Sequence, residues 1–211
     1  MLALMNLDPG LRERKKQRTR ETIARVAVEL FSERGYHATT LPDIAKAADV
    51  STRTIFAYFP SKEDILFCDF PALKEALARA LADRPEGHDA LETVREFILS
   101  AHEAKTSELD EQRHRVVESD DTLRSHLRAR LAELEELIAA AIAQDLGVSD
   151  DDVRPRVVAA SLIAAFDGLF DSETRAKPQS ADEVAALIDP VMTFLRGGLD
   201  ALREPRGTRS R

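Results

Sequence analysis

Residues 40–59 read TLPDIAKAADVSTRTIFAYF and predict two short helices joined by a tight turn. Thr40 and Asp43 have the spacing of a capping box, in which the hydroxyl accepts from an orphan amide and the carboxylate reaches back to the cap. Ser51 is a good N-cap for the second helix, which should end before Pro60 because proline disfavours helical backbone at the residue that precedes it. The expected helices are residues 40–48 and 51–59.

Apolar side chains of this segment can form one small core shared by both helices. They are Ile44, Ala45, Val50, Ile55 and Phe59. The exposed N-terminal end of the second helix then carries Thr52, Arg53 and Thr54. A short helix with such side chains at its leading end, held by a second helix behind it, suits the major groove of B-DNA. The segment therefore predicts a DNA-binding helix-turn-helix.

The polar residues of this motif have different expected roles. Arg53 can make a bidentate contact to a guanine edge, typically worth about 1–3 kcal/mol of discrimination, whereas threonines hydrogen-bond or touch a thymine methyl group. Tyr58, Lys62 and the capped helix start at Thr40 are expected to meet phosphates, and Ser51 is also expected to lie at the DNA.

A basic run precedes the motif. Six of the nine residues 12–20 are Arg or Lys, and this run, with Arg18 and Arg20, is expected to extend as a mobile arm along the DNA backbone or into a minor groove. A basic run can also be merely solvated, and its place before the motif favours DNA contact. The first helix is expected over residues 19–34, with Gly35 as its C-terminal stop.

Charge is unevenly distributed along the chain. The net charge of the 211 residues is −8, yet residues 1–62 hold 11 basic and 7 acidic side chains, and the remainder holds 19 and 31. The N-terminal part suits phosphate and the rest does not. No run of apolar residues approaches a membrane span and no signal peptide is evident, so we expect a cytoplasmic protein without a membrane partner.

Apolar residues recur at three-and-four spacing almost throughout, and sustained alternation is absent. The predicted fold is therefore all-α, with about nine helices: an N-terminal three-helix helix-turn-helix domain and a larger C-terminal helical domain. The helices expected after the motif are residues 61–83 with a kink at Pro71, then 89–105, 108–117, 120–145, 150–171 and 181–203.

The N-terminal region closely resembles the TetR/AcrR family over about residues 17–77. The resemblance is carried by TRETI (19–23), LFSERGY (30–36), TTLPDIA (39–45) and VSTRTIFAYFPSKE (50–63). It implies a homodimeric repressor that a ligand releases from a palindromic double-stranded DNA operator. The positions that match the family's DNA contacts are Thr40, Thr52, Arg53, Thr54, Phe56, Tyr58 and Lys62.

Two residues depart from the family pattern. Phe56 stands where tyrosine is frequent, so the hydroxyl is lost and van der Waals contact is the expected role. Pro42 cannot supply the polar contact that some members make from that position. The domains implied are a basic arm (1–16), a helix-turn-helix domain (17–77), a ligand-binding and dimerisation domain (78–203) and a disordered tail (204–211).

The C-terminal region resembles, more faintly, the subgroup whose effector domain is assigned to acyl-CoA-like ligands. The similar segments are residues 113–119, 123–127 and 154–160. An acyl chain needs a dry tunnel between helices. Candidate lining residues, which could equally be ordinary core, are Phe67, Phe70, Phe97, Ile98, Val116, Leu127, Leu131 and Phe166. The arginines that could bind CoA phosphates, or form a salt-bridged solvated face, are Arg95, Arg113, Arg115, Arg124 and Arg128.

The last two long helices have broad apolar faces for one terminal hairpin. By family resemblance they form an isologous four-helix dimer interface, although intramolecular packing alone is the alternative. The expected interface residues are Val157, Ala160, Ile163, Ala164, Val184, Leu187, Ile188, Val191 and Leu195.

Other classes of protein are poorly supported. His102-Glu103 lacks the second histidine of a metalloprotease motif and no glycine-rich phosphate loop occurs, so we expect neither an enzyme nor a cofactor or metal. Cys68 is the single cysteine, and we favour a small buried hydrophobe over a redox switch. Alternatives to an acyl-CoA-responsive repressor are an efflux regulator that senses aromatic or cationic compounds, and an architectural DNA-binding protein without a ligand.

Overall fold

The computed structural model describes residues 10–103, 108–149, 151–169 and 180–203. The regular elements in these ranges are helices and none is a strand, which confirms the predicted all-α class. The chain divides into two compact units, Met1–Cys68 and Asp69–Arg211. The expected tail at 204–211 and the first nine residues of the expected arm lie outside the described residues.

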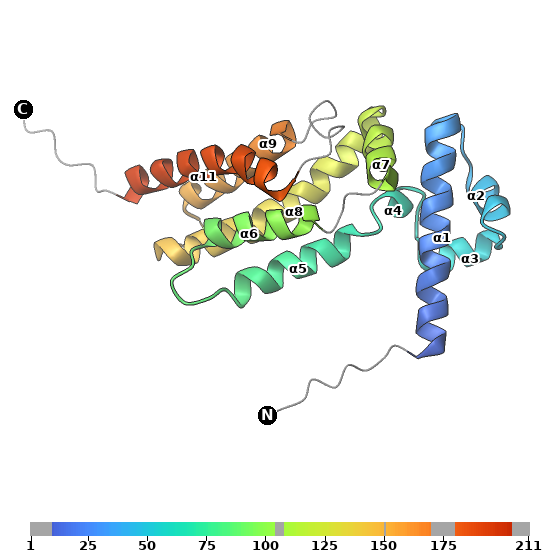
Figure 1. The fold of residues 1–211 in the computed structure, drawn as a ribbon, viewed down its shortest axis with the longest axis horizontal. Coiled ribbons are helices and arrows are strands. Elements are labelled where there is room, and N and C mark those ends of the chain that lie inside the picture. The colour runs from blue at the N-terminus through green and yellow to red at the C-terminus, as the bar shows by residue number, and fades with distance from the viewer. Residues whose placement is uncertain (1–9, 104–107, 150, 170–179, 204–211) are drawn as a thin grey trace, which may run out of the picture. The chain divides into compact units, whose positions relative to one another are not determined.

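The described part of the first unit, residues 10–68, contains four helices (Figure 1). They are α1 (Leu11–Arg34), α2 (Leu41–Ala47), α3 (Thr52–Tyr58) and α4 (Glu63–Leu66). The short helices α2 and α3 contact each other, and α2 and α4 each contact α1. Helix α1 is therefore the support on which the helix-turn-helix is built.

The start of α1 differs from the prediction. The helix begins eight residues before Thr19, so the described part of the basic run is helical and not an extended arm. Arg, Lys, Gln and Glu are good helix formers, and spacings of three and four residues add side-chain pairs. The Lys16 ammonium lies 3.3 Å from Glu13, and the Gln17 amide donates to Glu21 at 2.8 Å. These local terms favour a helix where we predicted an arm.

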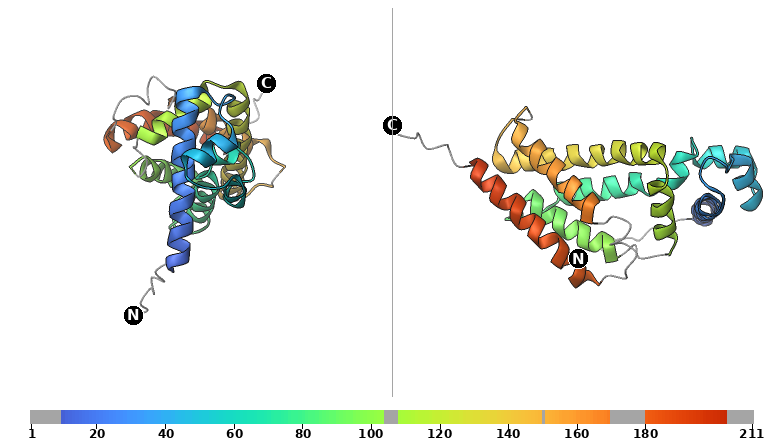
Figure 2. Two further views of the ribbon diagram at one scale, coloured as in Figure 1. Left: turned by 90° about the vertical axis from the view of Figure 1, so that its right-hand side faces the viewer. Right: turned by 90° about the horizontal axis from the view of Figure 1, so that it is seen from above.

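The second unit contains six described helices. They are α5 (Phe70–Ala82), α6 (Ala90–Glu103), α7 (Glu108–Glu118), α8 (Asp121–Leu146), α9 (Val153–Leu169) and α11 (Ala181–Arg203). Helix α8 is the central element, since it contacts α5, α6, α7 and α9, while α11 packs on α6 and α9 (Figures 1 and 2). No described helix combines the length and apolar character that crossing a membrane requires.

The single helix predicted over residues 61–83 is two helices. Helix α4 ends at Leu66 and α5 starts afresh at Phe70, with Pro71 in its first turn. Proline lacks an N–H group and suits the first turn of a helix, so it marks a new start here and not a kink. Ser61 and Asp64 form reciprocal capping bonds at the start of α4: Ser61 N donates to Asp64 at 3.1 Å, and Asp64 N donates to Ser61 Oγ at 3.1 Å.

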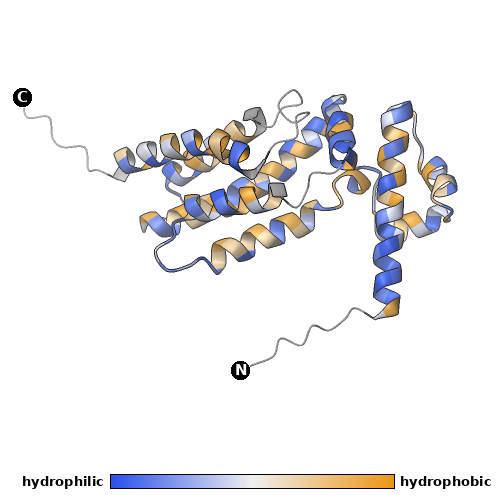
Figure 3. Ribbon diagram, viewed as in Figure 1, coloured by the Kyte–Doolittle hydropathy of each residue, from blue (hydrophilic) through white to orange (hydrophobic). Residues whose placement is uncertain are grey.

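The core of the second unit is built by apolar side chains from several of its helices. Side chains that are almost fully buried come from four of its helices: Leu91, Ile138, Ile142, Leu162 and Ile188. Ion pairs tie the helices at the rim of this core. Arg95 on α6 donates to Asp189 on α11 at 2.6 Å, and this bond lowers the pKa of the Asp189 carboxyl. Apolar and polar residues alternate around these helices as the helical period requires (Figure 3).

Candidate nucleic-acid interface

The small core beneath the helix-turn-helix forms as predicted. Ile44, Ala45, Ile55 and Phe59 are buried, and Val50 is partly buried. A helix of seven residues is marginal by itself, so packing of this kind must hold α2 and α3 in place. One face of α3 is thereby fixed toward the core and the other toward solvent.

A complete capping box starts α2. Thr40 N donates to the Asp43 carboxylate at 2.9 Å, and Asp43 N donates to Thr40 Oγ1 at 3.3 Å. The bonds from Thr40 lower the pKa of the Asp43 carboxyl. A lowered pKa means that this cap stabilises the fold above the carboxyl's ordinary pKa and is lost as the pH falls through the lowered value.

The turn between α2 and α3 is tight. Asp49 has a φ of 53°, the left-handed conformation that aspartate tolerates better than most residues. Ser51 then caps α3, because its Oγ accepts from Thr54 N at 3.0 Å and lies 2.7 Å from Thr54 Oγ1. The N-terminal end of α3 is thus held by its own side chains.

The solvent face of α3 presents the residues predicted to read bases. Arg53 is exposed, Phe56 is 55% exposed, and Thr52 and Thr54 are partly exposed. The exposed ring of Phe56 offers apolar surface to a thymine methyl group. Tyr58 is partly buried, with its ring centre 6.5 Å from that of Phe59.

Lys62, which the sequence predicted to contact phosphate, uses its donors inside the unit. Its Nζ donates to Tyr36 O at 2.8 Å and to Thr39 O at 3.1 Å, and it lies 3.9 Å from the centre of the Tyr36 ring. These contacts join the start of α4 to the loop between α1 and α2. In this structure the Lys62 side chain and the two backbone carbonyls to which it donates form an internal clip.

Three further residues of the clip were not anticipated. The Tyr36 hydroxyl donates to Glu63 at 2.5 Å, and the Thr39 hydroxyl, which is buried, donates to Gly35 O at 2.9 Å. The sequence carried one signal for Thr39, which directly precedes the N-cap Thr40. Hydroxyl groups at such positions often hydrogen-bond to backbone carbonyls at the end of the preceding helix. These contacts hold the loop that leads into the N-cap of α2.

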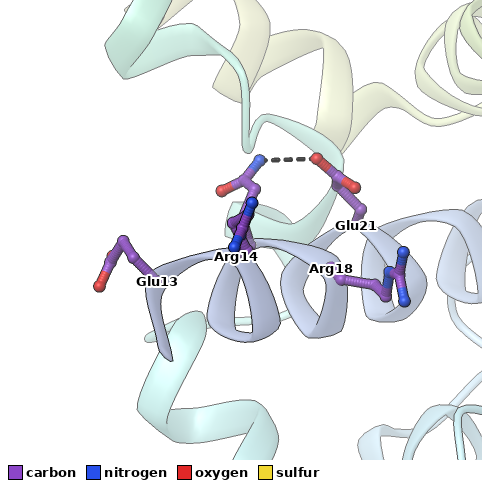
Figure 4. Close-up of a pocket in the computed structure, with 5 residues that line it drawn as sticks. Glu13, Arg14, Arg18 and Glu21 are labelled. Carbon is purple, nitrogen blue, oxygen red and sulfur yellow. Dashed lines mark hydrogen bonds between the residues drawn. The ribbon is translucent and has the colours of Figure 1, made fainter. Parts of the chain in front are cut away.

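The two predicted DNA contacts on α1 have different environments. Arg18 is exposed, whereas Arg20 is partly buried and donates to Cys68 O at 2.5 Å. Cys68 is buried, as predicted for a small hydrophobe. A shallow hollow on the exposed first turns of α1 is lined by Glu13, Arg14, Gln17, Arg18 and Glu21 (Figure 4). Because one helix supplies all of these side chains, the hollow is open surface and not a ligand pocket.

The residues predicted to line an effector pocket differ in their position and burial. Phe67 belongs to the first unit and Val116 is buried. The other six are partly buried: Phe70, Phe97, Ile98, Leu127, Leu131 and Phe166. Several of the arginines considered for CoA phosphates already form ion pairs, Arg113 with Asp69 at 2.8 Å and Arg95 with Asp189. Arg115 and Arg124 pair with Glu111 and Asp121 on their own helices, so for four of the five arginines the salt-bridged face describes the structure.

The predicted dimer residues also divide. Val184, Ile188 and Leu195 are buried in the core of the chain itself, so they have no surface left for a partner. The partly buried members are Ile163, Leu187 and Val191. Val157, Ala160 and Ala164 are exposed on α9. Phe194 was not predicted and is 76% exposed on α11; an aromatic residue off the core stripe of its helix was the signal available.

A buried two-helix core, a capped turn and an exposed second helix define a DNA-binding protein of the helix-turn-helix class. The family of bacterial regulatory proteins, tetR family, matches residues 23–67, and the MftR C-terminal domain matches residues 88–200. The transcriptional regulator TcmR of Streptomyces glaucescens is 37% identical over 161 residues, 72% of this chain and 71% of that protein. The chain belongs to the TetR family of transcriptional regulators.

Other relatives agree over greater lengths. The putative mycofactocin biosynthesis regulator MftR of Mycobacterium tuberculosis is 28% identical over 194 residues, 90% of this chain and 96% of that protein. Among solved structures, native NalD, the secondary repressor of the MexAB-OprM efflux pump in Pseudomonas aeruginosa, superposes with a TM-score of 0.63 at 25% identity, covering 85% of this chain and 96% of NalD. A SmeT–triclosan complex shares the fold, with a TM-score of 0.59 at 21% identity, 92% of this chain and 98% of SmeT.

The clip around Lys62 can be tested by stability measurements. Lys62→Ala should lower the free energy of unfolding by about 2 kcal/mol, because two loop carbonyls lose a charged donor. Lys46→Ala, on the exposed face of α2, should change it by less than about 0.5 kcal/mol. Urea unfolding followed by circular dichroism gives both values, and equal values for the two variants would show that the clip does not stabilise the unit.

Proposed function

We propose that this chain is a homodimeric repressor that binds a palindromic operator through α3 and leaves it when a hydrophobic small molecule binds the second unit. The observation that best supports this proposal is the solvent face of α3. Arg53 and Phe56 are exposed there, and the other side of the helix is anchored by buried Ile55 and Phe59. Side chains held in this way can enter a major groove without the entropic cost of ordering the helix on binding.

The division of labour at DNA follows from exposure. Arg53 is expected to read a guanine edge, and Phe56 with the threonines to contact thymine methyl groups. Arg18 and the other exposed basic residues of the first turns of α1 are expected to contact phosphates, now as one side of a rigid helix. Two copies of α3 would read successive major grooves about 34–36 Å apart.

The effector is expected at one end of the second unit. The partly buried residues lie at the start of α5, the end of α6, the first half of α8 and the end of α9, and these parts lie toward α7 (Figure 1). The almost fully buried core residues Leu91, Ile138 and Ile142 lie in the other halves of α6 and α8. Large apolar side chains that their own chain covers incompletely are what an apolar ligand would bury.

An acyl-CoA is the first effector class to test. The expected effector region lies within residues 88–200 for the most part, which match the MftR C-terminal domain, and an acyl chain is the long apolar group that such a lining suits. An aromatic compound is the second class, because the SmeT structure of the same fold is a complex with triclosan.

The dimer is expected to form through α9 and α11, which pack side by side (Figure 2). Val157 and Phe194 are 53% and 76% exposed, and the exposed Ala160 and Ala164 would allow a partner helix to approach closely. Large apolar side chains exposed on neighbouring helices indicate a surface that another protein covers. In an isologous dimer the exposed apolar face of α9 and α11 would pack against the same face of the second copy.

Release is expected to occur by a population shift. An effector that binds better to a conformer in which the two recognition helices are wrongly spaced lowers operator affinity by its differential affinity for that conformer. The free dimer binds the operator and the loaded dimer leaves it.

Selection from a pool of random duplexes tests the DNA assignment. The chain should enrich an inverted repeat with half-sites about one helical turn apart. Arg53→Ala should relax base preference at one position of each half-site by about 1–3 kcal/mol, whereas Arg18→Ala should weaken all sequences about equally and reduce the salt dependence. Equal effects of both variants on every sequence would refute the separate roles of the two arginines.

Sedimentation tests the dimer. Phe194→Glu should raise the dimer dissociation constant about a hundredfold or more, because two charges would be buried in the interface. Thr193→Glu, on the neighbouring exposed position, should leave the dimer intact. Equal weakening by both substitutions would place the interface elsewhere.

A thermal-shift screen tests the effector. At a hundred times its dissociation constant a ligand adds about 2.7 kcal/mol, which for a chain of this size should raise the Tm by about 5–10 °C. We expect a shift with acyl-CoAs, abolished by Phe97→Glu and kept by Phe56→Ala, and release of the selected duplex in a gel-shift titration.

Shifts with triclosan but not with acyl-CoAs would favour the aromatic class. No shift with acyl-CoAs, fatty acids or aromatic compounds would instead favour a DNA-binding protein without a ligand.

A further inference from the structure

The side chain of Arg20 joins three parts of the first unit. It projects from α1, its Nη2 donates to the Cys68 carbonyl at 2.5 Å, and its guanidinium carbon lies 5.4 Å from the centre of the Phe59 ring. Phe59 is the C-cap of α3, and Cys68 is the last residue of the unit. We propose that Arg20 is a positioning residue that fixes the point where the chain leaves the DNA-binding unit against both α1 and the end of the recognition helix.

Local structure alone cannot hold α1, the end of α3 and Cys68 in fixed positions relative to one another. Helix α4 has four residues, too few to be stable alone, and it is anchored by buried Ile65 and Leu66. Cys68 lies beyond this anchor, and the bond from Arg20 ties its backbone to α1. A hydrogen bond from a guanidinium to a carbonyl is stronger than one between neutral groups, and the ring of Phe59 adds a cation–π contact.

A neighbouring arginine shows that this environment is particular to Arg20. Arg18 precedes it by two residues on the same helix and is exposed, whereas Arg20 is partly buried. Residues two apart on a helix point in clearly different directions. Arg18 therefore points to solvent, where it can contact DNA phosphates, and Arg20 points to the inside of the unit.

The position of this contact gives it a regulatory consequence. The second unit begins at Asp69, directly after the carbonyl that Arg20 holds. A change in the course of the chain at Asp69 would act on this contact, and the same guanidinium lies over the ring of Phe59, the C-cap of the recognition helix. This consequence rests on the proposed function, since it concerns how effector binding would reach α3.

Thiol labelling tests the positioning role without DNA, because Cys68 is the single cysteine of the chain and is buried. In the free protein Arg20→Ala should accelerate reaction of Cys68 with DTNB about tenfold, the size expected from loss of one charged hydrogen bond. Arg20→Lys, which keeps a donor but loses the planar group, should accelerate it about threefold. Arg18→Ala should leave the rate unchanged.

The urea dependence of labelling separates local opening from lower global stability. Local opening exposes little surface, so the accelerated rate of both Arg20 variants should hardly change with urea below the unfolding transition. A steep rise with urea, or labelling of both variants at the rate of the unsubstituted chain, would overturn the proposal. If Arg20→Ala does not fold, Arg20→Lys carries the same test.

Salt dependence on the selected duplex separates positioning from phosphate contact. Arg20→Ala should lower affinity about fivefold with an unchanged slope of log K against log salt, whereas Arg18→Ala should reduce the slope by about 0.9 for each protomer. A reduced slope for Arg20→Ala would show a phosphate contact and overturn the proposal. A chain that binds no duplex would refute the proposed function alone, because the labelling experiment would still decide the role of Arg20.

Discussion

Burial of Ile55 and Phe59 is the constraint on which the DNA-binding surface depends. A seven-residue helix forms too few hydrogen bonds to be stable by itself, so α3 exists because these two side chains are held under it. Their burial also fixes the rotation of α3 about its axis. Arg53 and Phe56 are exposed for that reason, and the caps at Thr40 and Ser51 then set where the two helices of the motif begin.

Positive charge has two uses in the first unit. Arg18 and Arg53 are exposed, whereas Lys62 and Arg20 donate to backbone carbonyls within the unit. A basic residue next to a loop or a helix end finds uncompensated carbonyl oxygens there, and these compete with phosphate for its donors. The inward-facing pair thus shapes the scaffold that presents the outward-facing pair.

The second unit combines a dense core with apolar surface that the single chain leaves uncovered. The halves of α6 and α8 that carry Leu91 and Ile138 are closely packed. Partly buried aromatic residues lie toward α7, and Phe194 is exposed on α11. Uncovered apolar area in two places supports the two proposed occupants, a small molecule between helices and a second copy along the outer helices.

Sequence alone determined the all-α class, the helix-turn-helix, its caps and its small core, because helical period and capping are local and depend on residues three or four apart. Most helix bounds of the second unit followed from the same signals. Sequence alone placed the start of α1 wrongly and missed the break before Pro71. At both points residues that favour a helix compete with signals that end one. Only the tertiary structure decided that Lys62 and Arg20 turn inward and that Phe194 faces out. Those outcomes depend on carbonyls and helices 23 to 48 residues away in the chain, or on which face of a helix the fold covers, and no local pattern encodes either.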